Sequence, residues 1–110
     1  MDKKQAYEIA RKYAAYLKKN KSGIKKVYLF GSYVTGKTDE DSDIDMAIVF
    51  EVLSNSFDMQ VELMKLRRKF DTRIEPHPFR ENDFNLSNPF ANEVITNGFE
   101  LGQQDMNNNH

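Results

Sequence analysis

The apolar residues of this chain recur at helical spacing in two long segments. In residues 3–19 they stand three and four positions apart, which predicts an amphipathic helix that ends within residues 20–23. The same spacing returns in residues 59–70, where the apolar positions are expected to face the core. Ser56 is the expected N-terminal cap of this second helix.

A third, shorter helix is predicted near the C-terminus. Asn88 is a suitable capping residue, and Pro89 fits the first helical position, where its missing N–H costs nothing. The helix is expected to run to about Asn97 and to stop at Gly98. The polar residues 103–110 are expected to form a loose tail.

Three segments have the composition of β-strands. Residues 27–30 are a short apolar run, and residues 44–50 are nearly all apolar, as expected for a strand covered on both faces. Residues 72–75 predict a third strand, which is expected to end at Pro76 and Pro78 because proline cannot donate to a β-ladder. Helices and strands in this order predict a single small α/β (α+β) domain over residues 1–102.

Composition narrows the function classes. The chain has no cysteine, so a metal would need oxygen or imidazole ligands. The longest apolar stretch, residues 46–50, is far too short to span a bilayer, and the first ten residues lack a signal core, so a cytoplasmic protein is expected. Residues 1–26 carry nine Lys/Arg against two acidic residues. This basic segment could attract phosphates or an acidic partner, or it could simply solvate the first helix.

Two short motifs bring chemistry-bearing groups to neighbouring strands. Gly31-Ser32 ends the first strand, where exposed N–H groups and the Ser32 hydroxyl can bind an anion. A polar segment, residues 35–43, then leads to Asp43-Ile44-Asp45 at the start of the second strand. Alternate strand residues point the same way, so the two carboxylates should share a face with Cα atoms about 6.6 Å apart. Such a pair can bind Mg²⁺ together with substrate phosphates.

Gly31-Ser32, ten intervening residues and then Asp43-Ile44-Asp45 resemble the signature of the DNA polymerase β-like nucleotidyltransferase superfamily. With Gly36 and Ser42 included, the motif is similar to that of the stand-alone branch of this superfamily, the minimal nucleotidyltransferases, which include MntA-like antitoxins. The resemblance implies a mixed β-sheet flanked by helices. It also implies two Mg²⁺ ions and transfer of a nucleoside monophosphate, AMP from ATP or another nucleoside triphosphate, to a hydroxyl.

By this resemblance Gly31 and Ser32 hold the triphosphate, while Asp43 and Asp45 bind both nucleotide and metal. The family has a third carboxylate, usually Asp, on a neighbouring strand, and the matching position here is Glu75. Glu75 is therefore the expected third catalytic and metal-binding residue. Because glutamate is one methylene longer than aspartate, this departure puts the strength of catalysis in question.

Two further residues and one lysine pair are weaker candidates for a role in the site. His77 could bind a metal or shuttle a proton, although a rigid Pro-His-Pro turn would also explain it. Arg73 should lie on the Glu75 side of its strand, where it could contact phosphate or pair with an acidic residue. The pair Lys25-Lys26 could contact phosphate or face water.

The resemblance implies a partner protein. Minimal nucleotidyltransferases often occur with a small helical HEPN-type protein in toxin–antitoxin pairs, and some adenylylate a tyrosine of the toxin. This chain is too small for an acceptor domain of its own, so a partner could supply the hydroxyl. Two alternatives remain open: an inactive or weak nucleotide-binding antitoxin that acts by contact, and a transferase for small molecules such as aminoglycosides. Neither a membrane nor a nucleic-acid substrate is expected.

Overall fold

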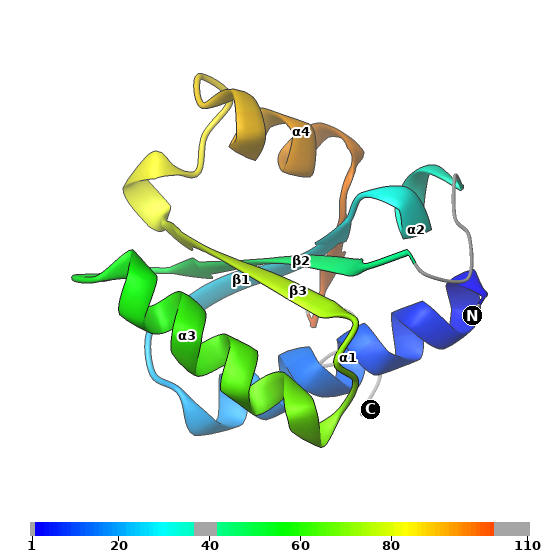
Figure 1. The fold of residues 1–110 in the computed structure, drawn as a ribbon. Helices are drawn as coiled ribbons and strands as arrows, with labels where there is room; N and C mark the ends of the chain where they lie inside the picture. The colour runs from blue at the N-terminus through cyan, green and yellow to red at the C-terminus, as the bar shows by residue number, and fades with distance from the viewer. Residues whose placement is uncertain (1, 37–41, 103–110) are drawn as a thin grey trace, which may run out of the picture.

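The computed structural model describes residues 2–36 and 42–102, which form four helices and four strands (Figure 1). In chain order these elements are α1 (Lys3–Asn20), β1 (Ile24–Phe30), α2 (Ser32–Thr35), β2 (Ile44–Phe50), α3 (Ser56–Leu66), β3 (Ile74–Arg80), α4 (Pro89–Asn97) and β4 (Phe99–Leu101). Two 3₁₀ turns, Arg67–Lys69 and Glu81–Asp83, follow α3 and β3. None of the helices in these ranges is both long and apolar enough to cross a membrane.

The strands form one mixed sheet in the order β3-β2-β1-β4. β1 pairs antiparallel with β2 and β4, whereas β2 and β3 run parallel. α1 and α3 lie on one face of this sheet and α4 lies on the other (Figure 1). The expected mixed sheet flanked by helices is confirmed.

Alternation along the strands divides the apolar side chains between two cores. On β1, Val27 and Leu29 join the larger core with α1 and α3, whereas Tyr28 and Phe30 join the smaller core with α4. β2 contributes to both cores, which confirms that this strand is covered on both faces. The α4 side therefore carries every odd-numbered side chain of β2, including Asp45.

The predicted helices are observed with two corrections at α3, which ends at Leu66 and is followed by a 3₁₀ turn where the pattern predicted helix up to residue 70. α1 and α4 begin and end where the pattern indicated, and Asn88 caps α4 through its side-chain oxygen. The cap of α3 is wrong: Asn55, not Ser56, accepts a hydrogen bond from the Asp58 backbone N–H at 3.0 Å. Asn55 caps the helix because its backbone is extended, as at most N-cap positions, while Ser56 is already helical.

The predicted end of the third strand is also wrong. β3 begins at Ile74 and continues through Pro76 and Pro78 to Arg80. β3 is an edge strand, and alternate residues of a parallel strand direct their N–H groups to opposite sides. Ile74 directs its backbone polar groups to the open edge of the sheet, where its carbonyl accepts from the Arg67 side chain. Pro76 and Pro78 are two and four residues further along the strand, so their ring nitrogens face the same open edge. No bond to β2 is lost.

The packing of α1 on α3 makes a testable contribution to stability. The fully buried Tyr13 hydroxyl donates to the Leu63 carbonyl at 2.7 Å, and burial raises the pKa of Tyr13. We expect Tyr13→Phe to lower the free energy of unfolding by about 1 kcal/mol, because one buried hydrogen bond is lost without a cavity. Urea denaturation measures the change, with the half-exposed Tyr16→Phe as the control; equal stability of Tyr13→Phe and wild type would contradict the assignment.

Candidate functional site

The candidate site lies on the α4 face of the sheet, where three strands present one residue each in a row. Phe30 on β1 pairs with Asp45 on β2, and Asp45 pairs with Glu75 on β3. Register partners project to the same face, so Asp45 stands between the other two side chains. The register thus makes Glu75 the direct neighbour of Asp45 on this face.

Gly31 makes the sharp turn that joins β1 to α2. Its φ of 82° and ψ of −150° belong to a region that L side chains rarely adopt. Its carbonyl accepts from the backbone N–H groups of Val34 and Thr35 at 3.0 and 3.1 Å, which closes the first turn of α2. Ser32 is the first residue of this helix. The N–H groups at its start have no carbonyl one turn earlier to bind.

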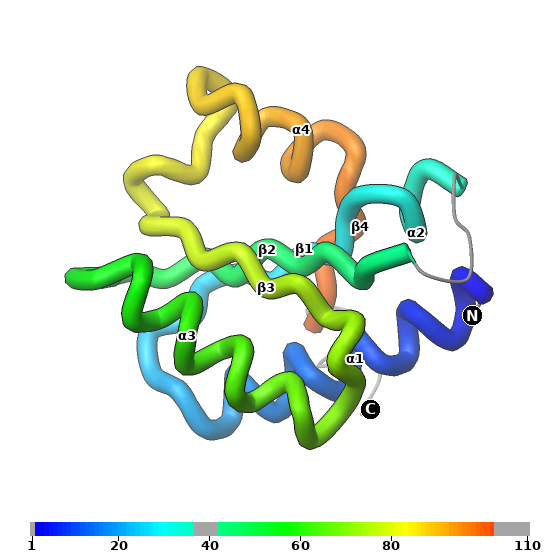
Figure 2. Tube along the Cα trace, viewed as in Figure 1, coloured from blue at the N-terminus to red at the C-terminus, as the bar shows by residue number. Residues whose placement is uncertain are grey.

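The Gly31 backbone also packs directly against Asp45. A Cβ built on Gly31 would overlap Oδ2 of Asp45 and would lie 3.2 Å from its Cγ. Glycine is therefore required here by space as well as by backbone angle. α2 lies at the end of β1 and beside the start of β2 (Figure 2), so the Gly-Ser turn and the Asp45 carboxylate form one small site.

His77 is a second neighbour of Asp45. Its Nε2 lies 3.4 Å from Asp45 Oδ1, and its ring packs against those of Phe30 and Phe90 at centroid distances of 5.4 Å. The alternative explanation of His77 by a Pro-His-Pro turn is wrong, because His77 lies inside β3. Strand parity explains the placement: His77 is two residues beyond Glu75 and shares its face.

Glu75 has a cationic neighbour that the sequence did not indicate. Arg67 Nη1 lies 3.9 Å from Glu75 Oε2 and also donates to the Ile74 carbonyl at 2.8 Å. The Glu75 side chain is 37% exposed, so it is accessible to solvent. The 3₁₀ turn that carries Arg67 breaks the helical period, which is why the spacing in the sequence gave no signal for this contact.

Asp43 immediately precedes β2 and is exposed, while Ile44 is fully buried. Ile44 therefore turns into the core, as the alternation indicated. Among residues 2–36 and 42–102, no three His, Cys, Asp or Glu side chains lie close enough together to hold a metal ion. Asp45 and Glu75 are register neighbours, and in the described residues they do not form such a group with Asp43.

The remaining cationic candidates lie elsewhere. Arg73 pairs with Asp71 through two side-chain hydrogen bonds of 2.9 and 2.8 Å, and this contact holds the pKa of Asp71 below its usual range. The acidic-partner alternative for Arg73 is therefore the one observed. Lys25 and Lys26 are exposed on β1, and Lys25 lies 4.0 Å from Glu51.

The family described as "Polymerase beta, Nucleotidyltransferase" matches residues 11–107. The chain is also 40% identical to "Putative protein adenylyltransferase MJ0604" of Methanocaldococcus jannaschii over 83 residues, which cover 73% of this chain and 80% of that protein. The family match includes the Gly-Ser turn, β2 and β3.

Solved structures share the fold. One, a mutant of a toxin–antitoxin pair MntA-HpeT, is 28% identical with a TM-score of 0.60, covering 86% of this chain and 73% of that chain. Another is a tri-AMPylated Shewanella oneidensis HEPN toxin in complex with MNT antitoxin, at 20% identity and a TM-score of 0.55, covering 93% and 77%. The chain belongs to the polymerase β nucleotidyltransferase family, and within it to the minimal nucleotidyltransferases.

Proposed function

We propose that this protein transfers AMP from ATP to a hydroxyl group of a partner protein, with Mg²⁺ bound at Asp43, Asp45 and Glu75. The observation that supports this most strongly is the packing of Gly31 against the Asp45 carboxylate. It brings an anion-binding turn and a potential metal ligand within one contact of each other. Phosphoryl chemistry needs both groups together, because metal ions offset the charge of the phosphate oxygens.

The side chains at the site suit magnesium. Asp43, Asp45 and Glu75 offer only carboxylate oxygens, which a hard cation prefers, and all three retain exposed surface. Mg²⁺ is usually held by one or two carboxylates together with substrate phosphates, so it does not need a cage closed by protein. Two such ions, shared with the triphosphate, would neutralise charge on the phosphate oxygens.

The chain's own groups have separate roles in this proposal. The N–H groups at the Gly31-Ser32 turn and the Ser32 hydroxyl bind the leaving phosphates. Glu75 accepts the proton of the attacking hydroxyl at a carboxylate oxygen. His77 contacts Asp45 Oδ1 and so restricts the orientation of that carboxylate.

The protein acceptor is supported by likeness to named proteins. The M. jannaschii relative is described as a protein adenylyltransferase, and the Shewanella complex contains an AMPylated HEPN toxin with its MNT antitoxin. We therefore propose a HEPN-type helical protein as the acceptor and an antitoxin role for this chain. A cytoplasmic setting, where ATP and such a partner are available, fits this role.

A second candidate function has one specific observation in its favour. Asp45 lies beside His77 and Glu75 beside Arg67, and the described part of the chain has no ready metal cluster. These contacts favour a protein that binds nucleotide, transfers it slowly or not at all, and neutralises its partner by contact. The two functions differ in whether AMP is covalently attached.

A label-transfer assay separates them. The protein is incubated with a purified HEPN-type protein, Mg²⁺ and ATP labelled at the α- or the γ-phosphate. The proposal expects acid-stable label on the HEPN-type protein from α-labelled ATP only, and none when EDTA is added. Formation of a complex without label from either ATP would favour the contact mechanism.

Glu75 gives a prediction of its own. We expect Glu75→Gln to lower the rate of transfer about a hundredfold, because proton acceptance and one Mg²⁺-binding carboxylate are lost. ATP binding should change less, because the phosphate contacts and the carboxylates of Asp43 and Asp45 remain. The rate under single-turnover conditions and calorimetric ATP binding measure the two quantities. Glu93→Gln on the exposed side of α4 is the matched control. Equal rates for Glu75→Gln and wild type would exclude a catalytic role for Glu75.

A further inference from the structure

α3 exposes an apolar stripe on the side that faces away from the larger core. Phe57 is 74% exposed and Val61 is 38% exposed, and the partly exposed Met64 continues the stripe one turn further. Met59, Leu63 and Leu66 take the opposite side of the helix and pack into the core. An exposed apolar stripe of this kind is a candidate surface for a partner.

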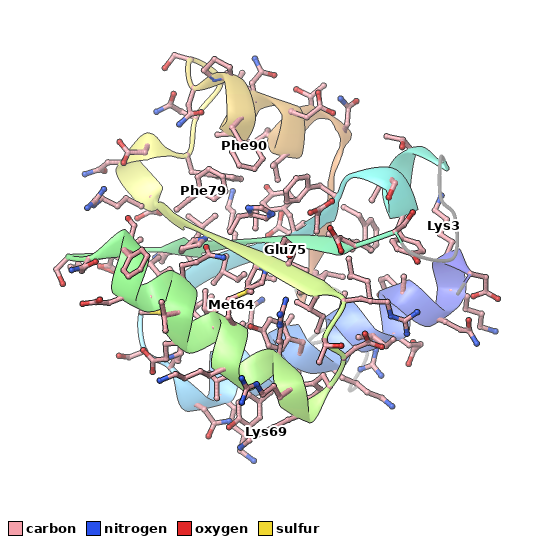
Figure 3. All side chains as sticks on the ribbon, in the orientation of Figure 1. Lys3, Met64, Lys69, Glu75, Phe79 and Phe90 are labelled. Carbon is pink, nitrogen blue, oxygen red and sulfur yellow. The ribbon has the colours of Figure 1, made fainter. Side chains whose placement is uncertain are left out.

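Two hollows along α3 extend this stripe into a groove. The first has a volume of about 310 Å³ and lies among Phe57, Gln60, His77 and Phe90. The second, about 460 Å³, lies among Gln60, Val61, Met64 and Arg67. Gln60 lines both, so the two hollows adjoin at this residue, and we call them together the α3 groove. Figure 3 shows Phe79 and Phe90 pointing toward one another at its α4 end.

The α3 groove includes the side chains that contact Asp45 and Glu75. His77, in the first hollow, lies 3.4 Å from Asp45 Oδ1. Arg67, in the second hollow, lies 3.9 Å from Glu75 Oε2. A molecule seated in the groove would therefore lie one side chain away from the reacting groups.

The groove also lies on the side from which an attacking hydroxyl must enter. The Gly31-Ser32 turn follows β1, whereas Glu75 and His77 are on β3, and β2 with Asp45 runs between these two strands. In-line attack on a phosphorus atom places the nucleophile opposite the leaving group. If the leaving phosphates bind at the β1 side, the acceptor approaches from β3.

The charge around the groove indicates the chemistry of its occupant. No Asp or Glu is among the residues that line the two hollows, whereas Lys65, Arg67 and Arg68 line the second one. The β3 edge itself is a poor template for strand addition, because Pro76 and Pro78 lack N–H groups and Arg67 occupies the Ile74 carbonyl. The occupant must therefore dock through side chains.

We propose that the α3 groove is the docking surface for the acceptor polypeptide, which presents acidic residues to Lys65 and Arg68 and inserts an apolar side chain beside Phe57. This inference rests on the proposed transfer function and adds to it the surface that selects the acceptor. It assigns specificity to residues outside the nucleotide site, so docking and nucleotide binding are separable.

Selection from a random 12-residue peptide library tests docking without ATP. Wild-type protein is expected to enrich peptides with Asp/Glu and at least one aromatic or large aliphatic residue. The double variant Lys65→Glu/Arg68→Glu should enrich basic peptides instead, and Phe57→Ser should retain about tenfold less peptide. Lys12→Glu/Lys19→Glu on α1 and Leu86→Ser before α4 are matched exposed controls and should behave as wild type. Thermal melting checks that each variant is folded.

The selected peptides that carry Ser, Thr or Tyr are then used as acceptors with α-labelled ATP. Acidic peptides that bind wild type, lose binding in the groove variants and become labelled would support both docking and transfer. Binding that depends on the groove without labelling would support the surface and contradict the proposed transfer. Labelling or enrichment that is unchanged in the groove variants, or wild-type selection without acidic preference, would overturn the docking proposal.

Discussion

Asp45→Asn is expected to lower the rate of AMP transfer about a thousandfold, equivalent to about 4 kcal/mol of transition-state stabilisation. Asp45 lies at the centre of the site, between Gly31, Glu75 and His77. An amide keeps the shape of the side chain but removes the negative charge that binds the metal. The fold should survive, because the carboxylate is partly exposed and belongs to neither core.

Single-turnover transfer from α-labelled ATP measures this loss, and thermal melting reports the fold. Asp83→Asn is the matched control: it removes one carboxylate from an exposed ion pair with Arg80, and such pairs contribute little. A folded Asp45→Asn protein that transfers AMP at the wild-type rate would show that the metal and nucleotide bind elsewhere.

Gly31→Ala is the second change with a large expected effect. At a φ of 82° an alanine costs about 1–2 kcal/mol of folding free energy, and its Cβ would also overlap Asp45 Oδ2. The overlap forces the Asp45 side chain or the turn to move, which adds about 1–3 kcal/mol. We expect loss of ATP binding together with a free energy of unfolding lowered by about 2–5 kcal/mol.

Gly23→Ala separates the two causes. Gly23 has the same φ of 82°, but nothing lies within 4 Å of a Cβ built there. This variant should show the cost of a positive φ without any steric overlap and should bind ATP normally. Urea denaturation and calorimetric ATP binding are measured on both proteins. If Gly31→Ala were no less stable than Gly23→Ala and bound ATP equally well, the contact between Gly31 and Asp45 would have no role.

The sequence predicted elements well where a local signal existed. β2 has the predicted bounds, and α4 begins after Asn88 and ends before Gly98, because capping residues and a continuous apolar run are local features. β4 was not predicted: its three residues are too few for a pattern, and it forms because Leu29 and its neighbours on β1 offer a free edge. β1 likewise begins earlier than predicted, at Ile24, through pairing with Phe50.

The same distinction applies to the candidate site: its motif residues were predicted, whereas their tertiary contacts were not. The motif placed Gly31-Ser32 at the end of β1 and Asp43 and Asp45 at the start of β2, and the register then set Glu75 beside Asp45. Sequence spacing could not indicate that Gly31 touches Asp45 or that Arg67 approaches Glu75, because both contacts depend on tertiary packing. The role of the prolines in β3 was misjudged for the same reason: only sheet order shows that β3 is an edge strand.

Between the two motifs, the structure differs from the prediction by one residue. Ser32–Thr35 forms the short helix α2, so the predicted polar loop begins one residue later than expected, at Gly36. Residues 37–41 and the expected tail at residues 103–110 lie outside the described residues.

Calorimetric titration of ATP into the purified protein, with Mg²⁺ or with EDTA, tests the central claim most directly. Asp43→Asn is titrated in parallel, with Asp83→Asn as the control. We predict saturable binding that requires Mg²⁺, is lost in Asp43→Asn and is unchanged in Asp83→Asn. Absence of ATP binding by the folded wild-type protein, or binding that persists in Asp43→Asn, would contradict a magnesium–nucleotide site at Gly31, Ser32, Asp43 and Asp45.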